Sequence, residues 1–525
     1  MAKPQFYPHR VSGIEQRDTH ISKVFLTGDY AYKIKKPVNL GFLDFNDLEN
    51  RQYYCEQEVT LNRRLAPRVY LAVVPITYQD GRYSLGGSAE PVEYAVKMVQ
   101  LPENLSMLRL LRQGRLGRDL LDKLARRLAE FYGQASGGAG INKFGSWRTV
   151  WINCEENFKE TECFAEDLID VHMFRIVRAV SRAFMVRRKT LFDRRVEAGK
   201  IRDCHGDLRS GHIYFSDGIQ IIDCIEFNDR YRYGDIAADM AFLAMDLDFE
   251  GYPQVARHLL NSYLEYTNDE EMLVLMDFYK CYRACVRVKV NCLRLSQSDP
   301  GTNERIRLLK ENDDYLNLAY RYAVGFTRPT VWVVCGLPAS GKSTIAKALS
   351  KMLDVEVISS DVVRRKLFGL SPYEPQVRQY QTGIYSKEAG SLTYGKLLML
   401  AQEKIEKGCS IILDAVYWYR HQRDEAIRLA EDMDTNIIFV ECTASHEILK
   451  KRLFARESTF TISDARLQHL EDMLARFESM DHLGDDMHIP INTEAILDES
   501  MRKIISLDYF LHSHLTAAVT QKGGM

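Results

Sequence analysis

The sequence predicts an α+β domain followed by an α/β domain with a parallel sheet. A chain of 525 residues is too long for a single hydrophobic core. Its first part shows strand-like runs and then helical stretches, whereas apolar strands and helices alternate beyond residue 329. We therefore predict domains over 1–325 and 326–515, with a disordered tail over 516–525.

The first strands and the first helix are expected near the N-terminus. Residues 22–36 indicate two strands joined by a tight Thr-Gly-Asp turn. A helical pattern covers about 48–65, and the strand-like runs 70–78 and 92–101 flank a glycine-rich turn at 81–87.

The rest of the first domain is mainly helical in pattern. Helices are expected from about 105 to 131 and from 151 to 200. A second β-rich stretch is expected over 204–227, followed by helical sequence to about 322, and 325–329 indicates a short linker.

The second domain begins with a strand, a glycine-rich turn and a helix over 330–353. Further apolar strands are predicted at 355–360, 410–416 and 436–442, with helices between them. This alternation is typical of a parallel α/β sheet.

Charge and apolar content exclude some classes of protein. The net charge of −2 gives no global basic field for nucleic acid or membrane, although a local basic cleft stays possible. The N-terminus lacks the apolar segment of a signal peptide, and no apolar run reaches the length of a membrane helix. We expect a cytoplasmic protein whose eleven cysteines are reduced, mostly buried thiols.

A phosphate-binding motif opens the second domain. Residues 336–343 fit G-x-x-x-x-G-K-[ST] without a mismatch, between an apolar strand and a helix. Backbone N–H groups of such a turn surround a β-phosphate, and the helix N-terminus adds a favourable dipole. Lys342 would reach the β/γ oxygens, and the Ser343 hydroxyl would ligate Mg²⁺. The candidate ATP-binding residues are Gly336, Leu337, Pro338, Ala339, Ser340, Gly341, Lys342, Ser343 and Thr344.

An acidic residue and an arginine follow the next strand. Asp361 and Arg364 lie just beyond its carboxyl end, where sites in such sheets are found. Asp361 would accept the proton of an acceptor hydroxyl, and Arg364 would hold the acceptor or its phosphate. The alternative is that Asp361 only caps a helix.

Three more residues complete this candidate site. Asp414 ends the strand at 410–416, where it would hold Mg²⁺ or its water shell, or orient the acceptor. Arg452 and Arg456 lie one turn apart on a helix after the strand at 436–442. They suit a lid that closes cations onto the phosphates, or they are solvated surface arginines.

Together these residues resemble the small P-loop kinases that include gluconate kinase, polynucleotide 5′-kinase, chloramphenicol phosphotransferase and zeta toxins. The resemblance covers about residues 330–510 and rests on the P-loop, S-D-x-x-R, L-D-A and the lid arginines. It implies a P-loop NTPase fold and phosphorylation of a hydroxyl. No motif identifies the acceptor.

The first domain carries another motif. His205-Gly-Asp207-Leu-Arg-Ser-Gly-His212 resembles the H-G-D-x-x-x-x-N loop of aminoglycoside phosphotransferases and their protein-kinase-like relatives. The resemblance implies that Asp207 accepts or orients the acceptor proton and that Asp223 binds metal. The motif departs from the family at His212, because neutral imidazole is a poor ligand for Mg²⁺.

The same resemblance implies a nucleotide-binding lysine. Lys33 fits the lysine that binds the α/β phosphates, with Glu58 as its helix partner and Lys35 as the second choice. Glu226 would replace the missing asparagine near the metal. Asp235 and Asp239 resemble acids that more often fix the catalytic loop than do chemistry.

A basic stripe lies on a later helix. Lys280, Arg283 and Arg287 recur at i, i+3 and i+7. They would bind an anionic acceptor or, as we favour, pair with Asp235 or Asp239.

The order of the two domains resembles a bacterial family that fuses an aminoglycoside-phosphotransferase-like domain to a P-loop kinase domain. We expect an ATP- and Mg²⁺-dependent phosphotransferase acting on a small-molecule hydroxyl, with a second kinase site in the first domain. One alternative is a polynucleotide or RNA kinase. The other is a regulatory ATPase switch with a degenerate first domain.

Overall fold

The computed structural model describes residues 1–512 apart from 20, 40, 42, 298–301, 371–382 and 458–466. The predicted tail over 516–525 lies outside the described residues. The chain divides into two compact units. Among the described residues, one comprises Met1–Asn268 and Met276–Tyr322, and the other comprises Asp269–Leu275 and residues 323–512.

The first unit begins with a six-stranded antiparallel sheet in the order β1-β2-β3-β6-β4-β5. The strands are β1 (Glu15–Asp18), β2 (Ser22–Leu26), β3 (Tyr30–Lys35), β4 (Tyr70–Gln79), β5 (Arg82–Leu85) and β6 (Pro91–Val99). The predicted hairpin over 22–36 is confirmed as β2 and β3. The patterns missed β1 and β5, because their exposed side chains show no apolar alternation.

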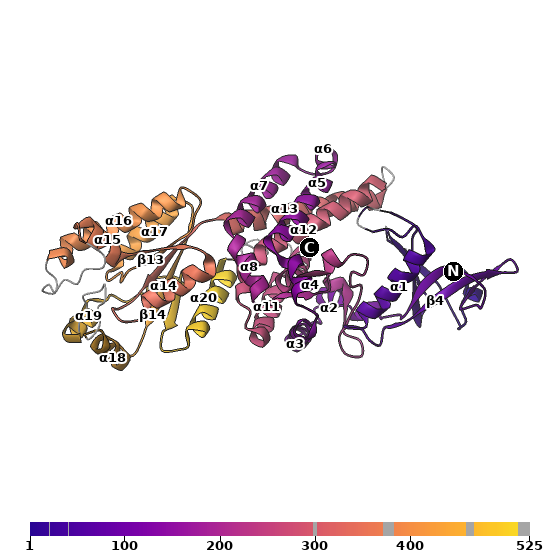
Figure 1. The fold of residues 1–525 in the computed structure, drawn as a ribbon, viewed down its shortest axis with the longest axis horizontal. Coiled ribbons are helices and arrows are strands. Elements are labelled where there is room, and N and C mark those ends of the chain that lie inside the picture. Colours follow the sequence, from indigo (N-terminus) through magenta and orange to yellow (C-terminus); the bar gives the residue numbers. More distant parts are fainter. Residues whose placement is uncertain are drawn as a thin grey trace. The chain divides into compact units, whose positions relative to one another are not determined.

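Helix α1 (Leu48–Asn62) packs on β4 and β6 (Figure 1). Cys55 and Val59, one turn apart, meet Val96 and Met98, which are two residues apart on one face of β6. The match of helical and strand periods therefore fixes α1 on this face of the sheet.

The rest of the first unit is mainly helical. Its helices are α2 (Met107–Arg112), α3 (Arg118–Gln134), α4 (Ala139–Asn142), α5 (Trp147–Glu162), α6 (Ala165–Leu168), α7 (Val171–Arg187), α8 (Lys189–Glu197), α9 (Asp229–Arg232), α10 (Ile236–Phe249), α11 (Pro253–Thr267) and most of α12 (Glu271–Gln297) and α13 (Asn303–Thr327). The linker prediction over 325–329 is partly wrong, because α13 continues through Thr327.

The β-rich prediction over 204–227 is also wrong in large part. Only β8 (Ile213–Tyr214) and β9 (Gln220–Ile221) form there, as a short antiparallel pair. A second short pair joins β7 (Ile201–Asp203) to β10 (Tyr233–Asp235). The polar residues between these strands form loops that are fixed by side-chain hydrogen bonds.

The second unit contains a five-stranded parallel sheet in the order β12-β13-β11-β14-β15, which confirms the predicted α/β class. The strands are β11 (Thr330–Cys335), β12 (Glu356–Ser359), β13 (Ile411–Asp414), β14 (Asn436–Thr443) and β15 (His488–Asn492). The helices are α14 (Lys342–Leu353), α15 (Ser360–Leu367), α16 (Lys387–Ile405), α17 (Arg420–Asp432), α18 (His446–Glu457), α19 (Leu470–Arg476) and α20 (Leu497–His512).

Helices cover both faces of this sheet (Figure 1). Val331 and Val333 bury one face of β11 against Leu397 of α16 and Ala426 of α17. Helix α14 packs on β11 and β13 and contacts α20. Because both faces are covered, the strands are continuously apolar, which is why the sequence identified them.

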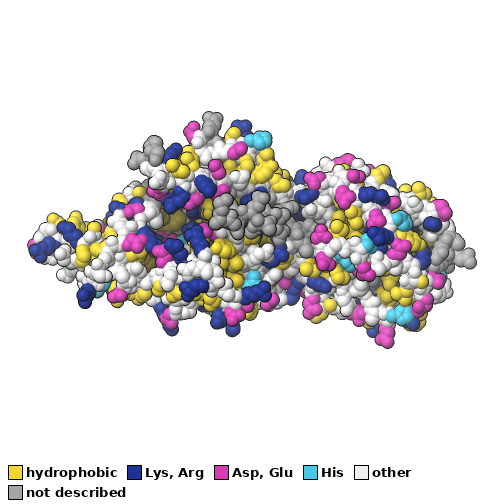
Figure 2. Space-filling view, turned by 180° about the vertical axis from the view of Figure 1, so that it is seen from behind, with side chains coloured by type: hydrophobic (Ala, Val, Ile, Leu, Met, Phe, Trp, Pro, Cys, Tyr) yellow, Lys and Arg dark blue, Asp and Glu magenta, His cyan; other side chains and the backbone are white. Residues whose placement is uncertain are grey.

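The surface shows no segregation of charge on the face seen in Figure 2, where Lys and Arg side chains are interspersed with Asp and Glu side chains. Among the described helices, none combines the length and the apolar character needed to cross a membrane. All eleven cysteines are described, and all are free thiols.

Candidate active sites

The glycine-rich turn of the second unit joins β11 to α14. Gly336 has φ +124° and Gly341 has φ +93°, conformations that side chains rarely adopt. A Cβ atom at Gly336 would also overlap the carbonyl oxygen of Cys442. The backbone therefore turns tightly beside β14, as the sequence motif requires.

Two side chains of this turn make defined contacts. Lys342 Nζ donates to the carbonyl oxygen of Leu337 at 2.8 Å, so it lies over the turn. Ser343 Oγ donates to Asp414 Oδ2 at 2.7 Å. The parallel register pairs Val334 with Asp414, which brings the end of β13 beside the start of α14. A hydroxyl and a carboxylate oxygen are ligands that Mg²⁺ prefers, so this pair fits the ion.

Asp361 lines the same cleft as Lys342 and Ser343, and the cleft volume is about 1950 Å³. The register pairs Ser359 with Asp414, so the segment after β12 starts at the same edge of the sheet. Arg364 Nη1 donates to Asp361 Oδ1 at 3.0 Å. The structure thus brings together the P-loop, Asp414, Asp361 and Arg364.

Aromatic side chains line the cleft as well. Trp418 and Tyr419 follow β13, and Arg476 Nη2 donates to the Tyr419 hydroxyl at 2.9 Å while its guanidinium lies 5.1 Å from the Trp418 ring centroid. The Arg364 guanidinium lies 4.9 Å from the centroid of Tyr385. Sequence analysis missed Trp418, Tyr419, Tyr385 and Arg476. The run of aromatic residues directly after the strand was a visible signal for Trp418 and Tyr419.

The candidate lid arginine Arg452 lies against the P-loop. Its Nη1 donates to the carbonyl oxygen of Ala339 at 3.3 Å, and its Nη2 donates to the carbonyl oxygen of Thr493 at 2.8 Å. Thr493 Oγ1 in turn donates to the carbonyl oxygen of Ser340 at 2.6 Å. A cation is thus held next to the turn. The side chain of Arg456 lies outside the described part of the chain.

In the first unit, buried carboxylates fix the loop after β7. Asp239 accepts from the backbone N–H groups of His205 at 2.8 Å and Gly206 at 2.9 Å. Asp246 accepts from the N–H of Ser210 at 2.8 Å. Asp239 therefore has the loop-fixing role expected for it, because its two charge-assisted bonds, with a third made by Asp246, set the path of the loop.

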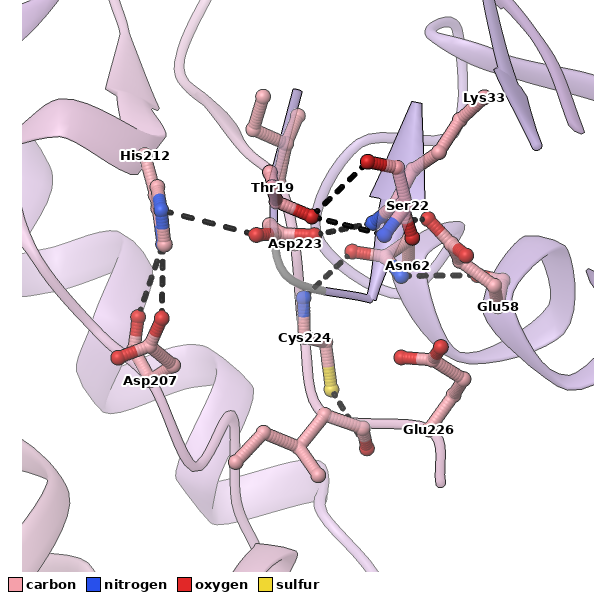
Figure 3. A network of polar contacts seen from close by, with 12 residues as sticks. Thr19, Ser22, Lys33, Glu58, Asn62, Asp207, His212, Asp223, Cys224 and Glu226 are labelled. Atoms are coloured by element: carbon pink, nitrogen blue, oxygen red, sulfur yellow. Dashed lines mark hydrogen bonds and ion pairs between the residues drawn. The ribbon is translucent and has the colours of Figure 1, made fainter. Parts of the chain in front are cut away.

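Lys33 lies between two carboxylates (Figure 3). Its Nζ is 2.8 Å from Glu58 Oε1 and 2.7 Å from Asp223 Oδ1. Burial by itself raises the pKa of Asp223, but the charge and the hydrogen bond of Lys33, together with His212 and Arg209, outweigh it and hold that pKa well below its usual range. The three residues that the resemblance singled out are thus neighbours.

Lys35 has a different environment from Lys33. It is 1% exposed, its Nζ is 2.8 Å from Glu58 Oε2, and it forms an ion pair with Glu226. The suggestion that Glu226 replaces the missing asparagine is wrong, because Glu226 neutralises Lys35 in the interior.

Arg209 joins Asp207 to His212. Its Nε donates to Asp207 Oδ1 at 3.0 Å, and its Nη2 donates to Asp207 Oδ2 and to His212 Nε2, both at 2.9 Å. Burial favours a raised pKa for Asp207, but the charge of Arg209 lowers it well below the usual range. Asp207 is therefore ionised near neutral pH. Sequence analysis missed Arg209, although it lies inside the motif.

The basic stripe does not pair as predicted. Lys280 Nζ donates to Asp248 at 3.0 Å, and Arg283 Nε donates to the carbonyl oxygen of Ala238 at 3.2 Å. The predicted pairing with Asp235 or Asp239 is wrong: Asp235 is bound by buried Arg195. The Arg287 guanidinium lies 5.6 Å from the ring centroid of Tyr315.

Comparisons with known proteins agree with this architecture. A model described as the Phosphotransferase enzyme family matches residues 54–275, and one described as an AAA domain matches residues 331–480. Uncharacterized protein Rv2004c of Mycobacterium tuberculosis is 34% identical over 448 residues, which cover 84% of this chain and 86% of the relative. Uncharacterized protein Mb2027c of Mycobacterium bovis matches to the same extent.

Further matches cover single domains. L-seryl-tRNA(Sec) kinase of Methanococcus maripaludis is 28% identical over 130 residues, 24% of this chain and 45% of that protein. A gluconokinase structure from Sinorhizobium meliloti has 16% identity and a TM-score of 0.27, covering 36% of this chain and 96% of that one. A choline/ethanolamine kinase family structure from Mesorhizobium loti has 12% identity and a TM-score of 0.35, covering 59% and 92%.

The fold and the family matches define an ATP-dependent phosphotransferase with two kinase-type domains. The chain belongs to the family of these mycobacterial proteins, and it joins a domain of the Phosphotransferase enzyme family to a P-loop kinase domain. The predicted family resemblance is confirmed.

Proposed function

We propose that the second domain transfers the γ-phosphoryl group of ATP to a hydroxyl group of a small molecule, with Asp361 as general base. The observation that carries this proposal is that Asp361 lines the same cleft as the P-loop. A carboxylate within reach of the γ-phosphate can take the hydroxyl proton as the oxygen attacks.

The remaining polar residues of the cleft would hold the nucleotide. Lys342, Arg364, Arg452 and Arg456 would hold phosphate charge. Ser343 and Asp414 would hold Mg²⁺, an ion that neutralises the charge of the β- and γ-phosphates when it is bound. The 2.7 Å bond between Ser343 and Asp414 supports this assignment, because both oxygens already face one point.

We also propose that residues 1–325 form a second phosphotransferase domain, with 326–515 as the P-loop domain. Lys33 would bind the α/β phosphates beside Glu58, Asp223 would bind the metal and Asp207 would be the base. The contacts of Lys33 with Glu58 and Asp223 support this. The alternative is a degenerate domain that binds nucleotide without turnover, because His212 stands where the family has asparagine.

Replacing Asp361 with Asn tests the main proposal. We expect transfer to fall at least about 10²-fold, because the amide cannot accept the proton. ATP binding, measured by calorimetry, should stay nearly unchanged. Asp432→Asn, an exposed change on α17, is the matched control and should keep full turnover. Wild-type turnover by the Asp361→Asn protein would exclude this role.

Phosphorylation of a metabolite extract with labelled ATP would identify the acceptor. Lys342→Ala should remove the products of the second domain, and Asp207→Ala should remove those of the first. ATP hydrolysis that no extract changes, together with a stable protein partner, would favour the regulatory ATPase instead. We also propose a cytoplasmic location, supported by the eleven free cysteines.

An RNA acceptor is the second candidate. It is supported by the partial match to L-seryl-tRNA(Sec) kinase and by the aromatic and arginine side chains of the cleft. It requires RNA binding that weakens steeply with salt, because phosphate contacts release counterions. Binding of tRNA that is unchanged between 50 and 200 mM salt, or absent, would exclude it.

A further inference from the structure

The candidate metal site of the first domain contains a histidine nitrogen in addition to carboxylate oxygens. One ligand atom each of Asp207, His212 and Asp223 lies within 4.8 Å of the others. In Figure 3 the His212 ring contacts both aspartates: Nε2 is 3.7 Å from Asp223 Oδ2, and Nδ1 is 3.7 Å from Asp207 Oδ2. An ion with bonds of about 2.1 Å can bridge two atoms at this separation.

The hydrogen bonds of His212 determine which nitrogen can bind an ion. Nδ1 is 3.0 Å from the carbonyl oxygen of Asp207, which can only accept, so Nδ1 carries the proton. Arg209 can only donate, so Nε2, 2.9 Å from its Nη2, carries a lone pair. Metal-binding histidines typically donate their other N–H to a carbonyl or carboxylate. The ring therefore already has the tautomer and the orientation of a ligand.

Arg209 shows that Asp207 and His212 favour a cation at this place. Its guanidinium contacts both Asp207 oxygens and His212 Nε2. A metal ion would compete with Arg209 for His212 Nε2, because this nitrogen has a single lone pair.

We propose that His212 Nε2 ligates a divalent transition ion such as Mn²⁺ together with Asp223, next to Asp207, so that this site prefers Mn²⁺ to Mg²⁺. Imidazole suits transition ions, and Mn²⁺ is the transition ion that also prefers carboxylate ligands, whereas Mg²⁺ demands oxygen ligands and keeps its waters. The residue that breaks the family motif thus changes the metal preference of the site. This inference rests on the proposed phosphotransferase site of the first domain, but it is tested by measuring metal binding and not turnover.

The experiment uses the nucleotide-free, full-length protein with Ser343→Ala, which removes a metal ligand from the P-loop. Mn²⁺ is added, and pulsed electron paramagnetic resonance detects nitrogen coupled to the bound ion. We expect the coupling of one imidazole nitrogen in this protein and its loss after His212→Asn. His258→Asn is the matched control, because His258 lies in the same unit and pairs with Asp122, away from the candidate site. It should keep the coupling.

Competition with Mg²⁺ gives the second readout. The ratio of Mn²⁺ to Mg²⁺ affinity should fall at least about tenfold in His212→Asn. Asp223→Asn keeps the His212 imidazole and should weaken the binding of both ions. It provides a second test of the site if the His212→Asn protein does not fold. Mn²⁺ bound without nitrogen coupling in the parent protein, or an unchanged affinity ratio, would overturn the proposal. A failure to detect phosphoryl transfer would count against the proposed function but not against this metal site, because the experiment measures metal binding only.

Discussion

Arg209 is the side chain that keeps Asp207 charged and oriented. It makes two bonds to the Asp207 carboxylate and one to His212, inside a loop that Asp239 and Asp246 fix from below. The Asp207 carboxylate can accept hydrogen bonds from a ligand, but the Arg209 guanidinium already occupies both of its oxygens. Arg209 must therefore move when an ion or a substrate approaches Asp207.

Arg209→Gln should raise the affinity of the first domain for Mn²⁺, on the order of tenfold, because a competing cation is removed. Titration of the nucleotide-free protein with Mn²⁺, followed by the loss of the free-ion resonance signal, measures it. Arg112→Gln removes an arginine paired with Glu250 elsewhere in the unit and serves as the control. A weaker affinity after Arg209→Gln would mean that the guanidinium supports the ion.

Two lysines two residues apart on β3 have separate tasks. Lys33 is 13% exposed beside Asp223, whereas Lys35 is 1% exposed between Glu58 and Glu226. Lys35 has no access to a ligand, so its ion pairs neutralise buried carboxylates. The charge of Lys35 therefore stabilises the fold, whereas Lys33 is the lysine that we propose binds the α/β phosphates.

Lys35→Met should lower the free energy of unfolding of the first unit by about 3–5 kcal/mol, because it leaves buried carboxylates without their cation. Urea denaturation followed by circular dichroism measures the change. Lys36→Met, which removes a partly exposed partner of Asp18, should cost at most about 1 kcal/mol. Equal effects of the two substitutions would show that the burial of Lys35 has no energetic consequence.

At the scale of elements, the conformation of the P-loop is set by the close approach of β14 to the end of β11. The turn from Gly336 to Gly341 has no room for a side chain at Gly336, and Thr493 and Arg452 hold it from the other side. The cradle is thus stabilised by segments more than 100 residues away in the chain.

Gly336→Ala should abolish nucleotide binding by the second domain and cost at least about 1–3 kcal/mol, from its backbone conformation alone. Gly395→Ala is the matched control: it lies in α16, outside the residues that line the cleft, and a Cβ there meets nothing within 4 Å. It should be neutral or stabilise by up to about 1 kcal/mol. Calorimetric ATP binding and thermal denaturation measure both, and full ATP binding by Gly336→Ala would contradict this account of the turn.

At the scale of the whole molecule, the chain carries two kinase-type domains, each with its own sheet and core. The six-stranded antiparallel sheet provides Lys33, while the five-stranded parallel sheet provides the P-loop and Asp414. The candidate catalytic residues of each site therefore come from within one unit.

We expect two unfolding transitions in scanning calorimetry, because each unit has its own core. Lys35→Met should lower the midpoint of one transition only, and Gly336→Ala that of the other only. A single transition that both substitutions shift equally would show that the units unfold together. ATP with Mg²⁺ should raise the midpoint of the second unit, and Lys342→Ala should remove that increase.

Much of the fold was predictable because its signals are local. The P-loop occupies eight consecutive residues between a strand and a helix, and apolar runs mark β11, β13 and β14. The short strand β15 and the exposed strands β1 and β5 were missed, since pairing with neighbours, and not their own composition, makes them strands.

The candidate sites were only partly predictable. Asp207, Asp223, Lys33 and Asp361 stand in motifs, so their residue types and spacing identified them. The partner of Lys35 and the position of Arg452 depend on contacts between distant segments, which no spacing in the chain encodes. Arg209 contacts Asp207, only two residues away, because of the path of the loop, which the motif by itself does not give.

The amino-acid sequence alone determined two kinase-type domains, their order and the residues of the phosphate turn, because contiguous motifs and strand patterns carry that information. The tertiary structure decided which charges meet. It gives Ser343 a hydrogen bond to Asp414, and it gives Lys33 and Lys35 ion pairs with Asp223 and Glu226. It also places the Arg209 guanidinium in contact with both Asp207 and His212. The physical reason is that an ion pair forms where strand register and loop path bring two side chains within about 3 Å, and only packing of the whole domain sets both.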